Sequence, residues 1–303
     1  MEWAKKYYSK TIKKHIELGS ADPRQTFQDW FTQQWAILRG SKIDPKEFPW
    51  LMGPFGNING IGVDFIIQLA EKENLVIERD KNTRGLIPSI DKLYLSEIEL
   101  SKLSQNIIRF YENTANYNLD LSVKWNPFFK VFGVLINKLF SNRINQLNIP
   151  TNNVEDAESI KSEIITLLDP RSNEVKYTIW LRTLKSTGKV IYSGVYGTCI
   201  LPSGKACVKA VFPLPKGNAT VIMTPSVGAF NELILDSSGK KMGDAGFYFL
   251  LNDTKGNYWS QYITSFHDRL TIRAENDLIL AEQTLTLWNQ RVLKFNYKIK
   301  AKE

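Results

Sequence analysis

The sequence predicts an α+β protein, in which a mainly helical N-terminal region precedes a large curved antiparallel β-sheet of barrel-like or helix-grip form. Apolar residues first recur every three or four positions, as on a helix, and from about residue 160 they alternate, as on a strand. Turn signals separate the later segments, and no helical pattern lies between them. These observations predict a helical region at 1–115 and an antiparallel β domain at 116–303.

The N-terminal residues contain three helical patterns. Residues 3–16 place aromatic and aliphatic side chains on one face and lysines on another, which predicts a basic amphipathic helix. The second helix follows Asp22, a suitable N-cap, has Pro23 in its first turn and ends at Gly40. A loop rich in glycine and proline then leads to a third helix at 61–72.

Residues 75–87 are predicted to form a hairpin. Its strands are 75–78 and Leu86–Ile87, and the turn between them carries Lys81 and Arg84. The third helix and this hairpin have the outline of a winged-helix unit, whose wing can contact phosphates. We favour a helix with a covering hairpin, because the preceding helices have no basic recognition face.

A capping box predicts the start of the next helix. Ser96 and Glu99 have the spacing at which each side chain caps the backbone amide of the other residue. The apolar face of this helix continues until a predicted end near Asn113. A strand at 118–125 and a long apolar helix at about 128–147 follow.

The C-terminal region begins after a polar linker at 148–159 and contains many short strands. About ten strands are too many for an open twisted sheet, so the sheet should curl, close or split into two layers. Strands that are apolar on both faces, such as 206–212 and 246–251, need a cover, for which the helix at 128–147 and the N-terminal helices are candidates. The expected strands are 175–184, 189–201, 206–212, 219–224, 232–236, 246–251, 258–266, 270–274, 278–288 and 292–299.

The net charge of +8 is distributed evenly, since residues 1–150 and 151–303 each contribute +4. A nucleic-acid-binding protein usually gathers its basic residues in a patch or stripe. The even distribution therefore indicates a solvated surface, and nucleic acid is not an expected partner.

Cysteine usage and hydropathy predict a cytoplasmic protein. Its two cysteines exclude a disulfide-rich scaffold and the usual cysteine-based zinc site. Residues 1–20 contain lysines but no continuous apolar core of a secretory signal. The longest apolar stretch, 128–140, is too short to cross a bilayer. Nothing in the pattern indicates an oligomeric state.

The cysteines also predict the register of one hairpin. Cys199 and Cys207 are equidistant from Ser203, so a tight hairpin with an odd-numbered loop places them opposite each other on one face. An even-numbered loop would place them on opposite faces. In a reducing compartment both should remain thiols that pack as small apolar side chains.

Histidine-based catalysis has little support in the sequence. His15 and His267 are the only histidines, and His15 is expected on the surface of the basic helix. His267 and Asp268 could form a dyad, but neighbouring strand residues point to opposite faces. We therefore interpret His267 as a turn histidine beside a solvated carboxylate.

Anion and metal sites also have little support. The glycine-rich loop at 53–62 precedes a helix and could hold an anion, but it lacks the lysine and hydroxyl residues of a phosphate-binding loop. Asp236, Asp244 and Asp253 mark turns and do not have metal-ligand spacing. No metal and no cofactor is predicted.

Aromatic residues are the main indication of a ligand site. They can line an apolar cavity enclosed by a curled sheet, or form an ordinary core of cross-strand aromatic pairs. The cavity candidates are Trp125, Trp180, Tyr192, Tyr196, Phe247, Tyr248, Tyr262 and Trp288.

The motifs at 110–112, 139–147 and 180–182, together with Trp125 and Pro150, resemble those of uncharacterised bacterial proteins. More loosely, they are similar to a domain of unknown function found behind saccharopine-dehydrogenase-like domains. The resemblance covers about half of the chain. It implies a single curved antiparallel sheet that grips a helix, and it carries no established activity.

Three functions remain open, and the lack of catalytic motifs favours the first of them. The first is a module that binds an apolar or amphipathic small molecule between the sheet and the helix at 128–147. The second is an interaction or membrane-surface protein, whose helix at 3–16 makes a weak contact with an anionic bilayer. The third is an enzyme with a non-standard site made from Arg143, Arg182, Asp244 and His267.

Overall fold

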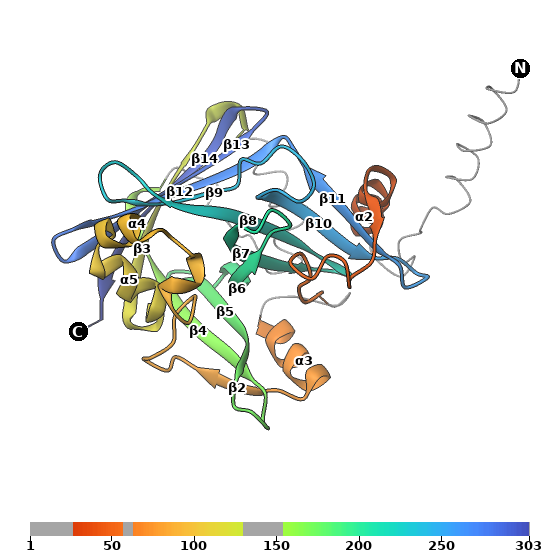
Figure 1. Cartoon of the computed structure of the whole chain (residues 1–303), viewed down its shortest axis with the longest axis horizontal. Helices are drawn as coiled ribbons and strands as arrows, with labels where there is room; N and C mark the ends of the chain where they lie inside the picture. The colour runs from red at the N-terminus through yellow and green to blue at the C-terminus, as the bar shows by residue number, and fades with distance from the viewer. Residues whose placement is uncertain (1–26, 57–62, 130–153, 303) are drawn as a thin grey trace, which may run out of the picture.

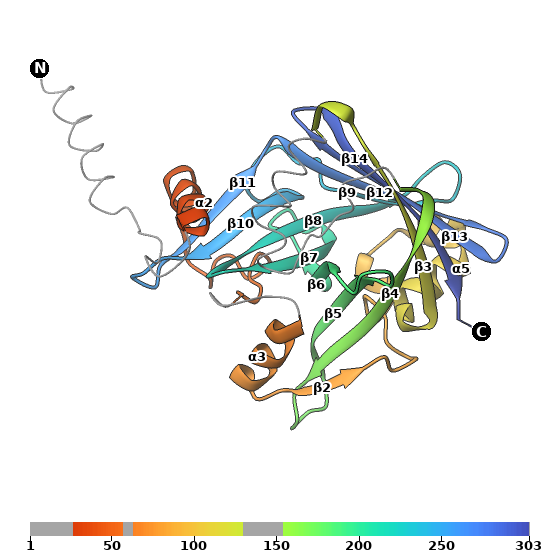
Figure 2. The same ribbon diagram turned by 180° about the vertical axis from the view of Figure 1, so that it is seen from behind.

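The computed structural model describes residues 27–56, 63–129 and 154–302. Its main element is a large antiparallel sheet that closes into a barrel-like ring, and a few helices from the N-terminal part of the chain lie around it (Figure 1, Figure 2). The protein is therefore α+β with a barrel, as the change of hydrophobic period predicts. The basic segment at 3–16, the cap at Asp22 and Pro23, and residues 130–153 of the apolar segment lie outside the described residues.

In the described part of the chain, ten strands follow one another around the ring, each antiparallel to its neighbours. The ring closes because the short β9 pairs with β12 on one side and with the end of β8 on the other. In spatial order the strands are β8 (Gly217–Val227), β7 (Ala206–Leu214), β6 (Val190–Ile200), β5 (Val175–Leu184), β4 (Val154–Leu168), β3 (Tyr117–Trp125), β14 (Gln290–Ala301), β13 (Leu278–Leu287), β12 (Phe266–Glu275) and β9 (Leu233–Asp236).

A side sheet branches from β8. The first half of β8 pairs with β10 (Gly246–Asn252), and β10 pairs with β11 (Tyr258–Ile263). Strand β1 (Ser41–Ile43) forms the outer edge on β11, and β2 (Val76–Arg79) pairs with β4. Segments from the N-terminal region thus extend the sheet that the C-terminal region forms.

Alternation of side chains gives each ring strand an inner and an outer face. On the inner face, Ile164, Trp180 and Phe295 belong to the main hydrophobic core. On the outer face, Ile165 and Ile179 pack against α3 (Val63–Glu73).

Other parts of the N-terminal region cover more of the outer surface. Trp50 and Leu51 pack in one cluster with Cys207, and Ala36 and Ile37 of α2 (Phe27–Arg39) pack against β10 and β11. The N-terminal region therefore provides the cover that the two-sided apolar strands require.

The predicted helix before Asn113 is two helices. The capping box of Ser96 and Glu99 is present at the start of α4 (Glu97–Lys102). The prediction of one continuous helix is wrong, because Leu103 has an extended backbone and the Ser104 side chain caps a new helix, α5 (Gln105–Glu112). The short helices η1 (Ile90–Leu93), before α4, and η2 (Thr114–Asn116), after α5, pack with α5 against the main core.

Two further predictions from the sequence are wrong. Leu86 and Ile87 do not form a strand, because their amides donate to Thr114 Oγ1 and to the carbonyl of Tyr111 at the end of α5. Strand β2 pairs with β4 instead, so no wing-like hairpin forms. The predicted linker at 148–159 is also too long at its C-terminal end, since β4 begins at Val154.

The register of the cysteine hairpin is confirmed. Cys199 of β6 lies opposite Cys207 of β7, and both are buried, free thiols. The odd-numbered loop around Ser203 therefore places both side chains on the same face of the sheet, the outer one.

Candidate functional site

A cavity of about 510 Å³ lies inside the ring, and apolar side chains form most of its surface. Its walls come from the inner faces of the strands, including Val221 of β8 and Leu270 of β12. Phe110 and Tyr111 of α5 and Ala36 of α2 also line it. The helices α5 and α2 lie at different sides of the sheet (Figure 1, Figure 2). This volume and composition are typical of small-molecule sites.

Arg182 is a cation in this apolar cavity. Strand alternation places it on the inner face of β5, two residues after Trp180, and the side chain is only 5% exposed. Its Cζ atom lies 4.1 Å from the ring centroid of Trp180 and 4.5 Å from that of Tyr192. The guanidinium group is therefore held between two aromatic rings by cation–π interactions.

The hydrogen bonds of Arg182 involve neutral oxygens. Its Nη2 atom donates to Tyr196 Oη at 2.9 Å, and Nη1 lies 3.5 Å from Tyr297 Oη. Its Nε atom has no hydrogen-bond partner among the described residues, and no described carboxylate lies within ion-pair distance. The positive charge is thus stabilised by rings and hydroxyl groups, and no carboxylate in the described part of the chain forms an ion pair with it.

Asp268 is an acidic residue in the same cavity. It lies on the inner face of β12, is 5% exposed, and accepts a hydrogen bond on Oδ2 from Gln283 Nε2 at 2.7 Å. Its Oδ1 atom has no partner in the described part of the structure. Burial raises the pKa of Asp268 to about 7, although the hydrogen bond from Gln283 and the charge of Arg182 act in the opposite direction.

Tyrosine hydroxyls complete the polar part of the cavity. Burial raises the pKa values of Tyr192 and Tyr196, and it raises that of Tyr297 to about 12. These hydroxyls therefore stay protonated near neutral pH and act as neutral donors and acceptors. The site combines an apolar wall with one end that carries a cation, hydroxyls and a titratable acid.

Four of the eight aromatic candidates line this cavity, and four lie elsewhere. Trp180, Tyr192, Tyr196 and Phe247 are part of its wall. Trp125 is buried in the main core. Tyr248 and Tyr262 pack together in the outer cluster with ring centroids 4.9 Å apart, because Tyr248 faces away from its neighbour Phe247. Trp288 is 70% exposed in the turn between β13 and β14.

The residues named for an enzymatic site do not converge where the structure describes them. Arg182 lines the cavity, whereas the Asp244 carboxylate accepts the backbone amides of Lys240 and Lys241 in a turn. His267 lies within β12, on the face opposite to Asp268, which lines the cavity. The prediction of a turn histidine beside a solvated carboxylate is therefore wrong, because His267 is a strand residue and Asp268 is buried. Arg143 and His15 lie outside the described residues.

The other motifs have structural roles. Asn218 Nδ2 donates to the carbonyls of Gly53 and Pro54, in the described part of the glycine-rich loop. Asp236 forms an ion pair with Arg269 at 3.2 Å. In the part of the chain that the structure describes, no group of three or more histidine, cysteine or acidic residues could hold a metal ion.

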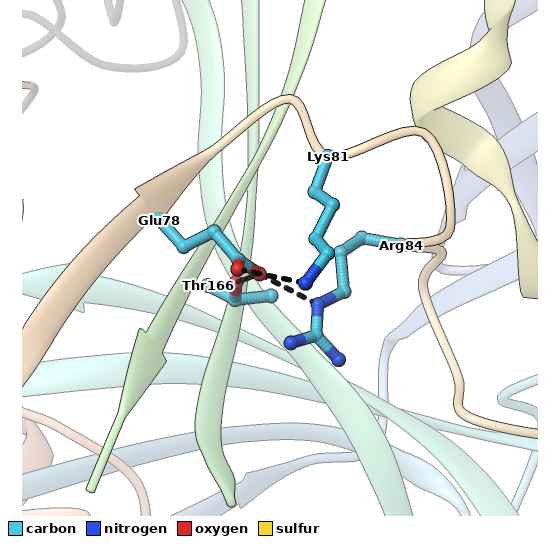
Figure 3. Close-up of polar contacts among 4 residues, drawn as sticks. All are labelled: Glu78, Lys81, Arg84 and Thr166. Carbon is cyan, nitrogen blue, oxygen red and sulfur yellow. Dashed lines mark hydrogen bonds and ion pairs between the residues drawn. The ribbon is translucent and has the colours of Figure 1, made fainter. Parts of the chain in front are cut away.

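The basic residues of the expected wing are bound to an acid of the same segment (Figure 3). Arg84 Nε lies 2.8 Å and Lys81 Nζ 3.3 Å from the carboxylate of Glu78, which also accepts a hydrogen bond from Thr166 Oγ1. The hydrogen bond from Arg84 is the main cause that lowers the pKa of Glu78. Lys81 and Arg84 thus share one carboxylate, which fastens this turn to β4 through Thr166.

Asp268, Gln283 and Tyr297 also line the cavity, although the sequence pattern did not predict them there. A signal for Tyr297 was present, since the strict alternation in 292–299 places it on the buried face. Asp268 was considered only as a neighbour of His267. Its role emerges only when strands from distant parts of the chain meet around Arg182.

Comparisons with known proteins reveal one informative similarity. Over 177 residues, or 58% of this chain, the sequence is 27% identical to the uncharacterized membrane protein YndJ of Bacillus subtilis (strain 168). The matched part is 31% of that protein, so the chain spans about a third of its length. No protein-family model and no solved structure matches the sequence. The chain is thus related to a protein of unknown function, as its motifs indicate.

The description of that relative as a membrane protein concerns the relative as a whole. Among the described residues of this chain, no helix has the length and apolar character needed to span a membrane.

Proposed function

We propose that this protein is a small-molecule binding module whose ligand, apolar or amphipathic, occupies the cavity inside the ring. The observation that carries this proposal is the cavity of about 510 Å³, with its mainly apolar wall and a few convergent polar groups. A core that served stability alone would be filled to the density of other protein interiors, with few voids larger than a water molecule. The mainly apolar wall and the few polar groups that converge in the cavity therefore support a ligand site.

Binding is also the function that the polar groups support best. Catalysis by acid and base requires groups within hydrogen-bond reach of a reacting atom. Of the three candidate catalytic residues that the structure describes, Arg182 lines the cavity. Asp244 and His267 do not line it. The cavity thus offers apolar surface and a polar anchor, which is what an amphipathic ligand needs.

Native mass spectrometry of the full-length protein purified from cells tests the proposal. We expect a bound small molecule that is released on denaturation. Binding is then measured with N-phenyl-1-naphthylamine, a neutral apolar dye whose fluorescence rises in an apolar site. Ligand-free protein that also fails to bind this dye would refute the proposal.

Two variants on β12 locate the binding site. Leu270 lines the cavity, so Leu270→Trp should fill part of it and weaken dye binding. Arg273 is on the opposite, exposed face of the same strand, so Arg273→Trp is the matched control and should leave dye binding unchanged. Equal binding by both variants and the wild type would place the dye outside the cavity.

We also propose that the module works in the cytoplasm. Cys199 of β6 and Cys207 of β7 face each other as free thiols. In an oxidising compartment, a disulfide between two such cysteines would be favoured. Burial raises the pKa of Cys199 to about 12 and also raises that of Cys207, which slows oxidation further. Thiol titration of unfolded protein prepared without reductant should detect both thiols, and a disulfide would contradict this location.

A further inference from the structure

The cavity contains a buried cation, Arg182, that forms no ion pair with a carboxylate of the described residues. Arg182 is 95% buried, and its partners among the described residues are two tyrosine hydroxyls and two aromatic rings. Burying a guanidinium ion without a counter-charge is costly. An anion that enters the cavity recovers part of this cost, because the attraction between opposite charges is strong where water is excluded.

The acid in the cavity does not act as the missing counter-ion. Asp268 is not within ion-pair distance of Arg182, and its Oδ2 atom is used by Gln283. The charged and titratable groups around it come from several strands: Arg182 of β5, Tyr192 and Tyr196 of β6, Asp236 of β9 and Tyr297 of β14. Arg182 is the one cation among them, and Asp236 opposes ionisation of Asp268. A protonated Asp268 can instead donate a hydrogen bond from its unpartnered Oδ1 side.

We propose that the ligand is an aliphatic carboxylate, with its head group beside Arg182 and its chain along the apolar wall, and that it binds together with a proton on Asp268. This inference rests on the proposed function and names its ligand class. Guanidinium groups match the geometry of carboxylates, and the tyrosine hydroxyls can donate to the same head group. An ionised Asp268 would repel the carboxylate, whereas a protonated one can donate to it.

Displacement of the neutral dye by three molecules of equal chain length tests the ligand class. They are dodecanoate, dodecanol and dodecyltrimethylammonium, which differ in head-group charge. At pH 6.5 we expect dodecanoate to bind about tenfold or more tightly than the other two. Arg182→Gln should abolish this preference, and Arg273→Gln, which changes an exposed arginine on β12, should preserve it.

The proton coupling is tested on the wild type, so it does not depend on the folding of an Arg182 variant. Dodecanoate is ionised throughout the range from pH 6 to 8. Burial raises the pKa of Asp268 to about 7, so Asp268 ionises between pH 6 and pH 8. The affinity of the protein for dodecanoate should therefore fall about tenfold across this range, while its affinity for dodecanol stays constant. Asp268→Asn, which is neutral at every pH, should give a flat profile for both molecules.

The possible failures are distinguishable. If the dye binds and dodecanoate is no better than dodecanol, the carboxylate inference is overturned and the binding module stands. If dodecanoate is preferred but its wild-type pH profile is flat, the coupling to Asp268 is overturned. If the dye does not bind at all, the proposed function fails and this inference fails with it.

Discussion

Lys209 on the outer face of the barrel and Arg182 on its inner face are both cations removed from bulk water, and their partners differ. Lys209 Nζ donates to the carbonyls of Trp50 at 3.1 Å and Met52 at 2.9 Å. Those carbonyls belong to a segment that packs on the outer face, so Lys209 fastens this segment to β7. Arg182 is held by rings and hydroxyls at the edge of a cavity.

The buried aspartates show the same contrast. Asp253, in the turn between β10 and β11, accepts hydrogen bonds from the amides of Lys255 and Asn257, the Asn257 side chain and Trp259 Nε1. Burial by itself raises its pKa, but these bonds outweigh burial and lower it. Asp268 has one such bond and a raised pKa. Fully partnered charges thus stabilise the outer layer, whereas incompletely partnered charges mark the inner site.

The largest expected difference is between the two aspartates. Asp253→Ala leaves buried amide and indole N–H groups without an acceptor, so we expect a loss of about 3 kcal/mol in the free energy of unfolding. Asp268→Asn at pH 7 should change this free energy by less than about 1 kcal/mol, because the aspartate is already half protonated. Urea denaturation of both variants measures the difference, and equal losses would remove the contrast.

The two cations provide the next comparison. Lys209→Met leaves two carbonyls without their donor, and we expect a loss of about 2.5 kcal/mol in the free energy of unfolding. Arg182→Met removes an unneutralised buried charge and adds apolar surface, so the ligand-free protein should lose less than about 1 kcal/mol or gain stability. Denaturation in urea after removal of bound ligand checks both values. A larger loss for Arg182→Met would show that Arg182 is mainly structural.

The pH dependence of stability sharpens the description of the inner site. The pKa of Asp268 is higher in the folded state, at about 7, than in the unfolded chain, near 3.8. Its contribution to stability is therefore complete below pH 4 and is lost as the pH rises through 7. Between pH 5 and pH 8 we expect the wild type to lose about 2 kcal/mol relative to Asp268→Asn. Parallel pH profiles of the two proteins would contradict this assignment.

The smallest effect on the free energy of unfolding is expected at the cluster around Glu78. Its charges have partners, like those of the outer layer, but they are partly exposed to solvent. Glu78 and Arg84 side chains are each 26% exposed, so solvent screens their ion pair. Glu78→Gln should lower the free energy of unfolding by about 0.5–1 kcal/mol, and added salt should reduce the difference. A loss comparable to that of Asp253→Ala would mean that this turn is as important to the fold as the outer layer.

Local patterns predicted most of the fold. The expected strand at 175–184 coincides with β5, and the cysteine hairpin has the expected register, because alternation and turn residues act over short distances. The closure of the ring could not be predicted, since it depends on the pairing of the short β9 with both β8 and β12. Likewise, Ser104 starts a new helix although the apolar pattern continues across it.

The candidate site was only partly predictable for the same reason. In 246–251 both faces are apolar, so sequence alone could not decide that Phe247 faces the cavity and Tyr248 faces away from it. Arg182 and Asp268 come from strands far apart in the sequence. They line the same cavity because the ring closes. Only the three-dimensional structure shows that both charged groups have few polar partners.

The pairing of β3 with β14 has a consequence for how the chain folds. These are the first and last strands of the ring, and they join Trp125 to Leu293. Contacts of such high sequence separation slow folding, because a long loop must close before they form. During synthesis on the ribosome, the ring cannot close until β14 has emerged, so the apolar inner faces of the intervening strands stay exposed until then. Loss of the C-terminal strand would therefore leave an open, aggregation-prone sheet edge on β3 and on β13.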